Sequence, residues 1–188
     1  MAKLISSLLL TLDGYAAGPN GELNIFPVNK EFFDYSHQFT DRAGTAMYGR
    51  RTFEIMNSYW PTAADGPDAS EHDRKHGKWY NAVEKIVVSH SVADAGPGTR
   101  IIGTDLTAQI GQLKQEKDKD IVMFGSPSTV RSLMGLGLID EYWIFMAPIV
   151  LGQGLPFFSL ETKRTDLHTV SSQKLSTGMV VLHLEPKA

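Results

Sequence analysis

The chain contains no cysteine among its 188 residues. Without cysteine there can be no disulfide bond, thiolate metal site, iron–sulfur cluster or cysteine nucleophile, and such a composition is typical of intracellular proteins. An excess of positive charge is also missing, because 18 Lys and Arg face 21 Asp and Glu and give a net charge of −3. A nucleic-acid partner requires a basic surface that neutralises phosphates, so we do not expect one.

Long apolar runs are absent as well. The longest, Trp143–Leu151, has nine residues and includes Pro148, whereas a membrane-spanning helix needs about 18 or more. The apolar segment Leu4–Leu12 has some features of a secretory signal, but two serines interrupt it and Asp13-Gly14 follows directly. A buried first strand therefore fits better than a signal peptide, and we expect a cytoplasmic protein with no membrane partner.

The remaining composition is that of a globular protein, with 42% hydrophobic and 21% charged residues. No repeat, linker or low-complexity segment is visible, and the length suits one domain. We therefore predict a single domain over residues 1–188.

Predicted strands alternate with predicted helices, and strands alone follow near the C-terminus. Strands are expected at 4–12, 45–48, 85–89, 100–102, 121–124, 141–150, 167–175 and 179–184, with a hairpin turn at 176–178. Helix starts are indicated at Asn29, at Gly49, at Thr104 or Asp105, at Ser126, and at a capping box Asp68-x-x-Glu71 within residues 61–80. This order predicts an α/β fold with a mainly parallel central sheet, flanking helices and an antiparallel C-terminal edge.

Open sheets of this kind bind ligands at the carboxyl ends of their strands, and four such ends carry suitable residues. At Gly49-Arg50-Arg51-Thr52, glycine allows close approach, the first helical amides are free donors, and arginine adds positive charge. Adjacent arginines point about 100° apart on a helix, so we expect one of them to face the ligand. The turn suits a phosphate or pyrophosphate, and the alternative is an ordinary surface helix with two solvated arginines.

The segment Gly125-Ser126-Pro127-Ser128-Thr129 repeats this arrangement, with three hydroxyls and no acidic residue at the helix start. Neither turn matches the Rossmann fingerprint or the P-loop pattern. The sequence therefore predicts two anion-binding turns on one sheet.

The other two strand ends are polar. Ser89, His90 and Ser91 can bind a further phosphate or a ribose, or can be ordinary turn residues. Asp13 can orient a substrate or relay a proton, with a pKa raised by burial, or can form an Asx turn with Gly14.

Other catalytic chemistry has less support. His72 and His76 have the spacing of metal ligands on one helix face, but no third ligand or H-E-x-x-H pattern accompanies them, so we expect no metal. The G-x-S-x-G elbow of serine hydrolases is also missing.

Together these motifs resemble the dihydrofolate reductase-like fold. They are most similar to the family of the C-terminal reductase domain of the bifunctional riboflavin-biosynthesis deaminase–reductase. The segments that carry the resemblance span the chain in order: Thr11–Pro19, Gly49–Glu54, Tyr59-Trp60-Pro61, Lys85–Ser89, Gly125-Ser126, Gly137–Tyr142 and Pro148–Gly154. The chain has neither the length nor the cysteines of the deaminase half, so it resembles a stand-alone reductase domain.

The resemblance implies an NADPH-dependent reductase that transfers a hydride to a pterin-like or pyrimidine-like substrate. One such activity is that of a 5-amino-6-(5-phosphoribosylamino)uracil reductase in riboflavin biosynthesis. The resemblance also implies a homodimer that pairs through its C-terminal strands. It assigns the cofactor phosphates to Gly49, Arg50, Arg51 and Thr52, the adenosine 2′-phosphate region to Ser89, His90 and Ser91, and the pyrophosphate to Gly125, Ser126, Ser128 and Thr129.

The segment Asp13–Gly18 is expected, by the same resemblance, to close over nicotinamide and substrate. Asp13 is then the catalytic candidate, and Glu31 and Asp34 are weaker candidates for an acid on the first helix. The expected substrate-binding residues are Gly14, Tyr15, Leu151, Gly152 and Gly154, and the expected further cofactor contacts are Ala17 and Gly18.

Two departures from the family pattern concern the substrate and the nicotinamide of the cofactor. Tyr15 stands where the riboflavin enzymes usually have a basic residue, which counts against a phosphoribosyl substrate. Phe124-Gly125 stands where the family usually has a pair of glycines after the fourth strand, which counts against a close approach of nicotinamide there. A true riboflavin or folate pathway enzyme therefore stays as an alternative. So does a non-catalytic, dinucleotide-binding dimeric protein on the same fold.

Overall fold

The computed structural model describes residues 1–92, 94–159 and 162–187, and an eight-stranded sheet in the order β5-β4-β3-β6-β1-β7-β10-β9 forms its centre. The strands are β1 (Leu4–Thr11), β2 (Tyr15–Ala17), β3 (Ala43–Gly49), β4 (Glu84–Val88), β5 (Thr99–Ile102), β6 (Asp120–Phe124), β7 (Glu141–Ala147), β8 (Leu155–Pro156), β9 (Leu167–Lys174) and β10 (Val180–Pro186). The helices are α1 (Lys30–Thr40), α2 (Arg50–Tyr59), α3 (Glu71–Ala82), α4 (Leu106–Glu116) and α5 (Pro127–Gly135).

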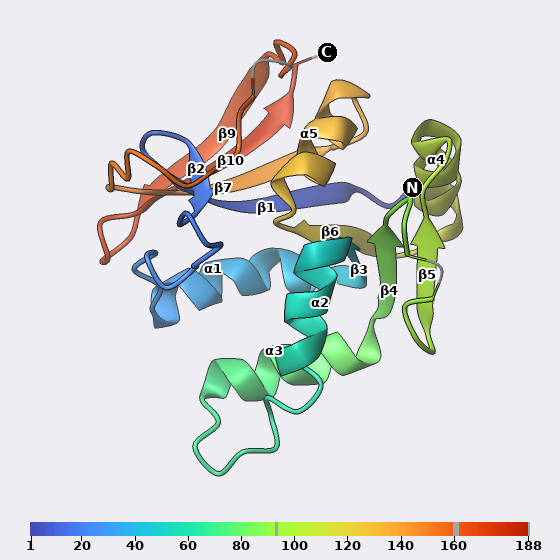
Figure 1. Cartoon of the computed structure of the whole chain (residues 1–188), viewed down its shortest axis with the longest axis horizontal. Helices are drawn as coiled ribbons and strands as arrows, with labels where there is room; N and C mark the ends of the chain where they lie inside the picture. Colours follow the sequence, from blue (N-terminus) through green and yellow to red (C-terminus); the bar gives the residue numbers. More distant parts are fainter. Residues whose placement is uncertain (93, 160–161, 188) are drawn as a thin grey trace.

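The predicted fold class is confirmed. Neighbouring strands from β5 to β7 are parallel, whereas β10 is antiparallel to both β7 and β9. Helices α1, α2 and α3 lie on one face of the sheet, and α4 and α5 lie on the other (Figure 1). Both faces of β1 are consequently buried, with Ile5 in a cluster with Phe32 of α1, and Leu4 in a cluster with Leu133 of α5.

The placement of consecutive helices on opposite faces creates a topological switch point in this sheet. The adjacent strands β3 and β6 are followed by α2 on one face and by α5 on the other (Figure 1). Ligands of open α/β sheets bind where the connections diverge in this way. The two predicted anion-binding turns therefore lie side by side at the expected place.

Three elements differ from the sequence-based expectation. The sequence predicts no strand directly after Gly14, but β2 forms there because it pairs with β8, which is remote in the sequence. Helix α3 starts at a capping box of Ser70 and Asp73, not at Asp68, and is longer than expected. Strand β7 ends at Ala147 because Pro148 has no amide hydrogen to continue the ladder.

Across the part of the chain that the structure describes, no helix combines the length and apolar character that a bilayer crossing requires.

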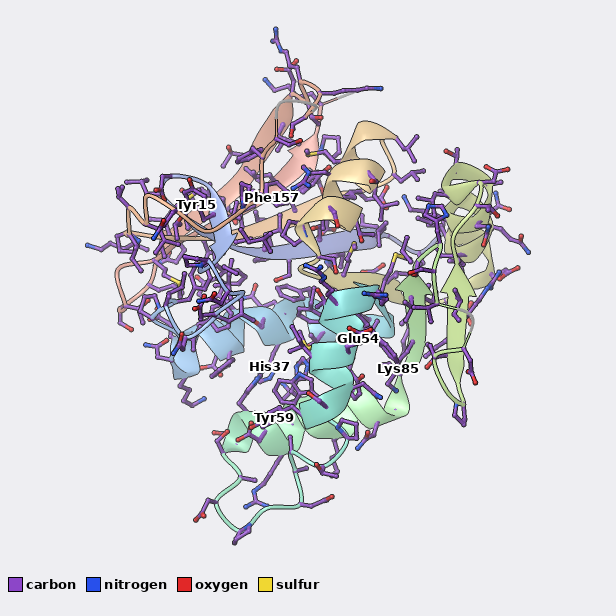
Figure 2. All side chains as sticks on the ribbon, viewed as in Figure 1. Tyr15, His37, Glu54, Tyr59, Lys85 and Phe157 are labelled. Carbon is purple, nitrogen blue, oxygen red and sulfur yellow. The ribbon has the colours of Figure 1, made fainter. Side chains whose placement is uncertain are left out.

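Three imidazoles gather between α1 and α3, where Figure 2 shows His37 facing α3. The His72 ring stacks on Phe33 at a centroid distance of 3.6 Å, and the His76 ring lies 4.2 Å from Trp60. Burial lowers the pKa of His72 to about 4 and that of His76 to about 3, and it also lowers the pKa of His37. One buried nitrogen of each ring has no hydrogen-bond partner among the described residues. The cluster is therefore stable only while its rings are neutral.

This cluster predicts acid-sensitive stability. Because the folded-state pKa values lie below the ordinary value of 6.5, the unfolded chain binds protons that the folded chain does not. Stability is then complete above pH 6.5 and falls as the pH drops toward 3, by about 1.4 kcal/mol per pH unit for each such group. When the free energy of unfolding is measured with urea at pH 7, 6 and 5, it should decrease less steeply with falling pH in His76→Phe than in the wild type. His168→Gln, in the exposed strand β9, is the control, and equal slopes in all three proteins would contradict the account.

Candidate dinucleotide site

The hydroxyl of Ser126 joins the two predicted anion-binding turns. The amide of Gly49 donates to Ser126 Oγ at 3.0 Å, and Thr52 Oγ1 lies 2.7 Å from the same oxygen. A Cβ on residue 49 would lie 2.4 Å from Ser126 Oγ and 2.5 Å from Thr129 Oγ1. Only glycine therefore allows the start of α2 to approach α5 this closely.

The N-termini of α2 and α5 differ from those of the other three helices. Asn29, Ser70 and Asp105 each accept a hydrogen bond from a first-turn amide of α1, α3 and α4. Helices α2 and α5 have no such side-chain cap and no acidic residue in the first turn. Their free amides and the positive ends of their dipoles suit an anion, and the two helices meet at the switch point.

Ser126 was expected to cap α5, and its side chain does not do so. It occupies the N-cap position, but its hydroxyl bonds to Gly49 in place of its own helix. Its φ of 55° lies in the left-handed region, which costs a residue with a side chain on the order of 1–2 kcal/mol. Gly125 before it has the same φ without this cost. The tie between the two turns is thus maintained against local strain.

The two arginines of the α2 turn occupy different positions. Arg50 Nε lies 3.5 Å from Glu54 Oε1, one turn along the helix. Thr52 faces Ser126, and successive residues of a helix are rotated by about 100°. Arg51 therefore flanks the face that meets α5, whereas Arg50 lies nearly opposite to it.

The polar residues at the end of β4, Ser89, His90 and Ser91, are separate from these two turns. Ser89 Oγ accepts hydrogen bonds from the amides of Ser91 and Val92, which is ordinary turn chemistry, and His90 is exposed. The carbonyl of Ser89 approaches Gly103 so closely that a Cβ there would lie 2.4 Å from it. The structure thus places Ser89, His90 and Ser91 beside the end of β5 and not against Ser126.

Asp13 holds two distant segments together. Its carboxylate accepts hydrogen bonds from the amides of Leu151 (3.0 Å) and Gly152 (2.7 Å) and from the hydroxyl of Thr11 (2.7 Å). The Tyr15 hydroxyl donates to the carbonyl of Gly152 at 3.2 Å. We call residues 13–17 and 149–158 together the clasp.

Backbone pairing completes the clasp. Strand β2 pairs with β8, and the amide of Phe157 donates to the carbonyl of Gly14 at 2.9 Å. A Cβ on Gly154 would lie 2.4 Å from the carbonyl oxygen of Ala17. Six predicted site residues are therefore brought together here: Asp13, Gly14, Tyr15, Leu151, Gly152 and Gly154, with Ala17 beside them. Gly18 follows in a turn closed by its amide and the carbonyl of Glu22.

The expectation of a raised pKa at Asp13 is wrong. The carboxylate is exposed, and the hydrogen bond from Thr11 followed by those from the Gly152 and Leu151 amides lowers its pKa to about 2. Hydrogen bonds to the charged form favour that form. Asp13 is therefore ionised at neutral pH.

The two weaker acid candidates on α1 are both engaged elsewhere. Glu31 accepts hydrogen bonds from the amide (2.7 Å) and hydroxyl (2.5 Å) of Ser176 in the C-terminal hairpin. Asp34 pairs with Lys30 at 3.0 Å on the exposed side of the helix.

Sequence reasoning missed Arg131 and Thr11. Arg131 Nη1 donates to the carbonyl oxygens of Phe157 (2.6 Å) and Pro156 (3.2 Å). Thr11 accepts from the amide of Tyr15 and donates to Asp13. A threonine two residues before an aspartate is a local signal for such a turn, but no local signal marks Arg131.

Among the described residues, one cluster has the ligand types of a metal site: Glu141, His183 and Glu185. It lies where β7 begins and β10 ends, away from the switch point. Lys3 and Arg42 form ion pairs with Glu141 at 2.8 and 2.5 Å. Side-chain cations therefore already compensate its buried charge.

Comparison with known proteins identifies relatives of the whole chain. Residues 2–181 match the family model of the RibD C-terminal domain. The uncharacterized protein YwjB of Bacillus subtilis (strain 168) is 36% identical over 182 residues, which cover 96% of each chain. YyaP of the same strain, also uncharacterized, is 30% identical over 180 residues, 95% of this chain and 92% of that protein.

Solved structures confirm the fold. A putative riboflavin biosynthesis protein from Shewanella sp. PV-4 has a TM-score of 0.74 and 21% identity over the full length of both chains. Dihydrofolate reductase from Enterococcus faecalis, solved with NADP(H), has a TM-score of 0.64 and 13% identity over 99% of this chain and 97% of that one. The chain therefore has a dihydrofolate reductase-like fold and belongs to the RibD C-terminal domain family, which supports a reductase-type function.

Proposed function

We propose that this protein is an NADPH-dependent reductase that transfers a hydride to a small heterocyclic substrate. The observation that carries the proposal is the meeting of two uncapped helix N-termini, those of α2 and α5, at the switch point of the sheet. A pyrophosphate offers the adjacent anionic groups that two such turns suit. The family supports the reductase class.

The residues of the two turns fit the phosphates of a dinucleotide. The first-turn amides, the hydroxyls of Ser128 and Thr129 and the guanidinium of Arg51 would hold them, and neither first turn carries a carboxylate to repel them. When bound, NADPH supplies the hydride. The turns orient the phosphates, which fixes where the reacting end of the dinucleotide can lie.

The clasp has a supporting role in this proposal. Its two segments would cover the reacting ring and exclude water, which strengthens the polar interactions inside the site. Asp13, which is ionised, holds the amides of Leu151 and Gly152 in place and is a positioning residue rather than a proton donor.

A pyrimidine-like or pterin-like ring is the proposed substrate, on the basis of the family resemblance. Glu31 and Asp34, the two candidates on α1 for the single acid that would bind a pterin amino group, both contact other residues, which favours a pyrimidine-like ring. Tyr15, which bonds to Gly152, adds no cation for a phosphoribosyl group. NADPH oxidation in the presence of dihydrofolate would indicate a folate-pathway enzyme, and oxidation in the presence of 5-amino-6-(5-phosphoribosylamino)uracil would indicate a riboflavin-pathway enzyme. Oxidation with neither compound would favour another substrate.

A non-catalytic dinucleotide-binding dimer is the second candidate. Strand β9 supports the dimer, because it is an exposed edge of the main sheet whose charged residues are few, and such edges are ready to pair with another chain. The homodimer and the cytoplasmic location both stay predictions. Cofactor binding without NADPH oxidation by any ring of the proposed class would favour this candidate over the reductase.

The first prediction concerns binding at the two turns. At 100 times its dissociation constant, NADPH should add about 2.7 kcal/mol of stability, or roughly 5–10 °C in thermal midpoint. Gly49→Ala should weaken NADPH binding by about tenfold or more, because its Cβ would push Ser126 and Thr129 away. Gly111→Ala, whose Cβ would meet nothing within 4 Å, is the control. An unchanged affinity in Gly49→Ala would place the phosphates elsewhere.

The second prediction concerns the choice between NADPH and NADH. We assign the 2′-phosphate, the extra negative charge of NADPH, to Arg51. Arg51→Ala should then raise the dissociation constant of NADPH by about tenfold and that of NADH by less than about threefold, because a charge-assisted hydrogen bond to the 2′-phosphate is lost. Arg50→Ala should change both dissociation constants by less than these amounts, since Arg50 lies opposite Thr52 and near Glu54. Calorimetric titration of both variants measures this, and equal losses for the two cofactors would refute the assignment of Arg51.

The third prediction concerns the role of Asp13. Asp13→Asn should reduce kcat, because an amide cannot accept all the hydrogen bonds that the carboxylate accepts. The pH dependence of kcat between pH 5 and 9 should keep its shape, since the pKa of Asp13 is about 2. Loss of a limb of the pH profile in Asp13→Asn would show instead that Asp13 transfers a proton.

A further inference from the structure

The clasp has one side-chain hydrogen-bonding link to α5 among the residues that the structure describes. Arg131, in the second turn of α5, donates from Nη1 to the carbonyl oxygens of Phe157 at 2.6 Å and Pro156 at 3.2 Å. Figure 2 shows Phe157 between β2 and α5, with Tyr15 beside it. Arg131 therefore joins the helix that carries one anion-binding turn to the segment that covers the site.

The carbonyl groups that Arg131 binds lie within the paired part of the clasp. Pro156 pairs with Tyr15 across β2 and β8, and the amide of Phe157 donates to Gly14. The Phe157 side chain is buried, with 2% exposure, in the same apolar cluster as Val130 of α5. A shift of α5 at Arg131 is therefore transmitted to both segments of the clasp, because they are hydrogen-bonded to each other.

The charge of Arg131 is not neutralised by a nearby carboxylate. No ion pair of Arg131 occurs among the described residues. A single nitrogen, Nη1, donates to both main-chain carbonyls, and the residue lies five positions, or about 7.5 Å along the axis, from the N-cap of α5.

We propose that Arg131 is a positioning residue that couples an anion at the α5 turn to closure of the clasp; this rests on the function proposed above. An anion held by the first-turn amides restrains α5, and Nη1 of Arg131 then restrains Pro156 and Phe157. Through Phe157 and Gly14 the restraint reaches β2. Cofactor binding thereby lowers the population of open clasp before any substrate arrives.

The test follows hydrogen exchange of the clasp amides in the absence of substrate. The probes are the amides of Gly14, Tyr15, Leu151, Gly152 and Phe157, all of which have hydrogen-bond partners within or next to the clasp. Saturating NADPH should slow their exchange in the wild type by about tenfold, which corresponds to a shift in the opening equilibrium.

The decisive variant is Arg131→Lys, which keeps the positive charge but is one bond shorter, so that its ammonium cannot occupy the position of Nη1. Its affinity for NADPH, measured by calorimetry, should stay within about threefold of the wild type, but NADPH should no longer slow exchange in the clasp. Ser132→Ala, which removes a hydroxyl bonded within α5, is the matched control and should behave as the wild type. Arg131→Gln repeats the test if Arg131→Lys does not keep the wild-type circular dichroism spectrum.

The outcomes separate the inference from the function on which it rests. If NADPH binds Arg131→Lys and slows clasp exchange as much as in the wild type, the coupling role of Arg131 is wrong and the reductase proposal is unaffected. If NADPH binds neither protein, the proposed cofactor and the coupling both fail. If NADPH binds the wild type without slowing exchange in the clasp, the clasp does not respond to the cofactor and the inference is again overturned.

Discussion

The hydroxyl of Ser126 is the contact on which the arrangement of the site depends. It accepts a hydrogen bond from the amide of Gly49 and lies within hydrogen-bonding distance of Thr52 Oγ1. The starts of α2 and α5 are therefore held against one another. Because this hydroxyl bonds to the start of α2, it does not cap its own helix, and the first-turn amides of α5 stay available. A single side chain thus both joins the two turns and leaves their donors free for an anion.

The second level of organisation is the clasp. Its segments are far apart in the sequence, and an ionised carboxylate, a pair of short strands and a tyrosine hydroxyl hold them together. The low pKa of Asp13 follows from this arrangement, because the same hydrogen bonds that hold Leu151 and Gly152 stabilise the charged carboxylate. The proposed site therefore combines two helix ends, to which we assign the phosphates, with a cover built from β2, β8 and the loops beside them.

The fold class and the positions of the two turns could be predicted from the sequence, for identifiable reasons. Gly49, Ser126 and Pro127 mark helix starts through local rules of backbone conformation, so the two turns could be located without coordinates. Asp13 could be singled out, but its partners lie 138 and 139 residues away, and its pKa depends on them. Strands β2 and β8 and the contacts of Arg131 were missed because short strands and long-range contacts leave no periodic pattern.

The central claim is that the free amides of α2 and α5 bind the phosphates of NADPH, and amide NMR spectroscopy of the labelled protein tests it most directly. Titration with NADP⁺ should move the amide signals of Arg51, Thr52, Ser128 and Thr129 most, because these are first-turn donors of the two uncapped helices. The amides at the starts of α1, α3 and α4, which already have side-chain caps, should move little. Saturating changes at capped helix starts, with none at α2 and α5, would contradict the account.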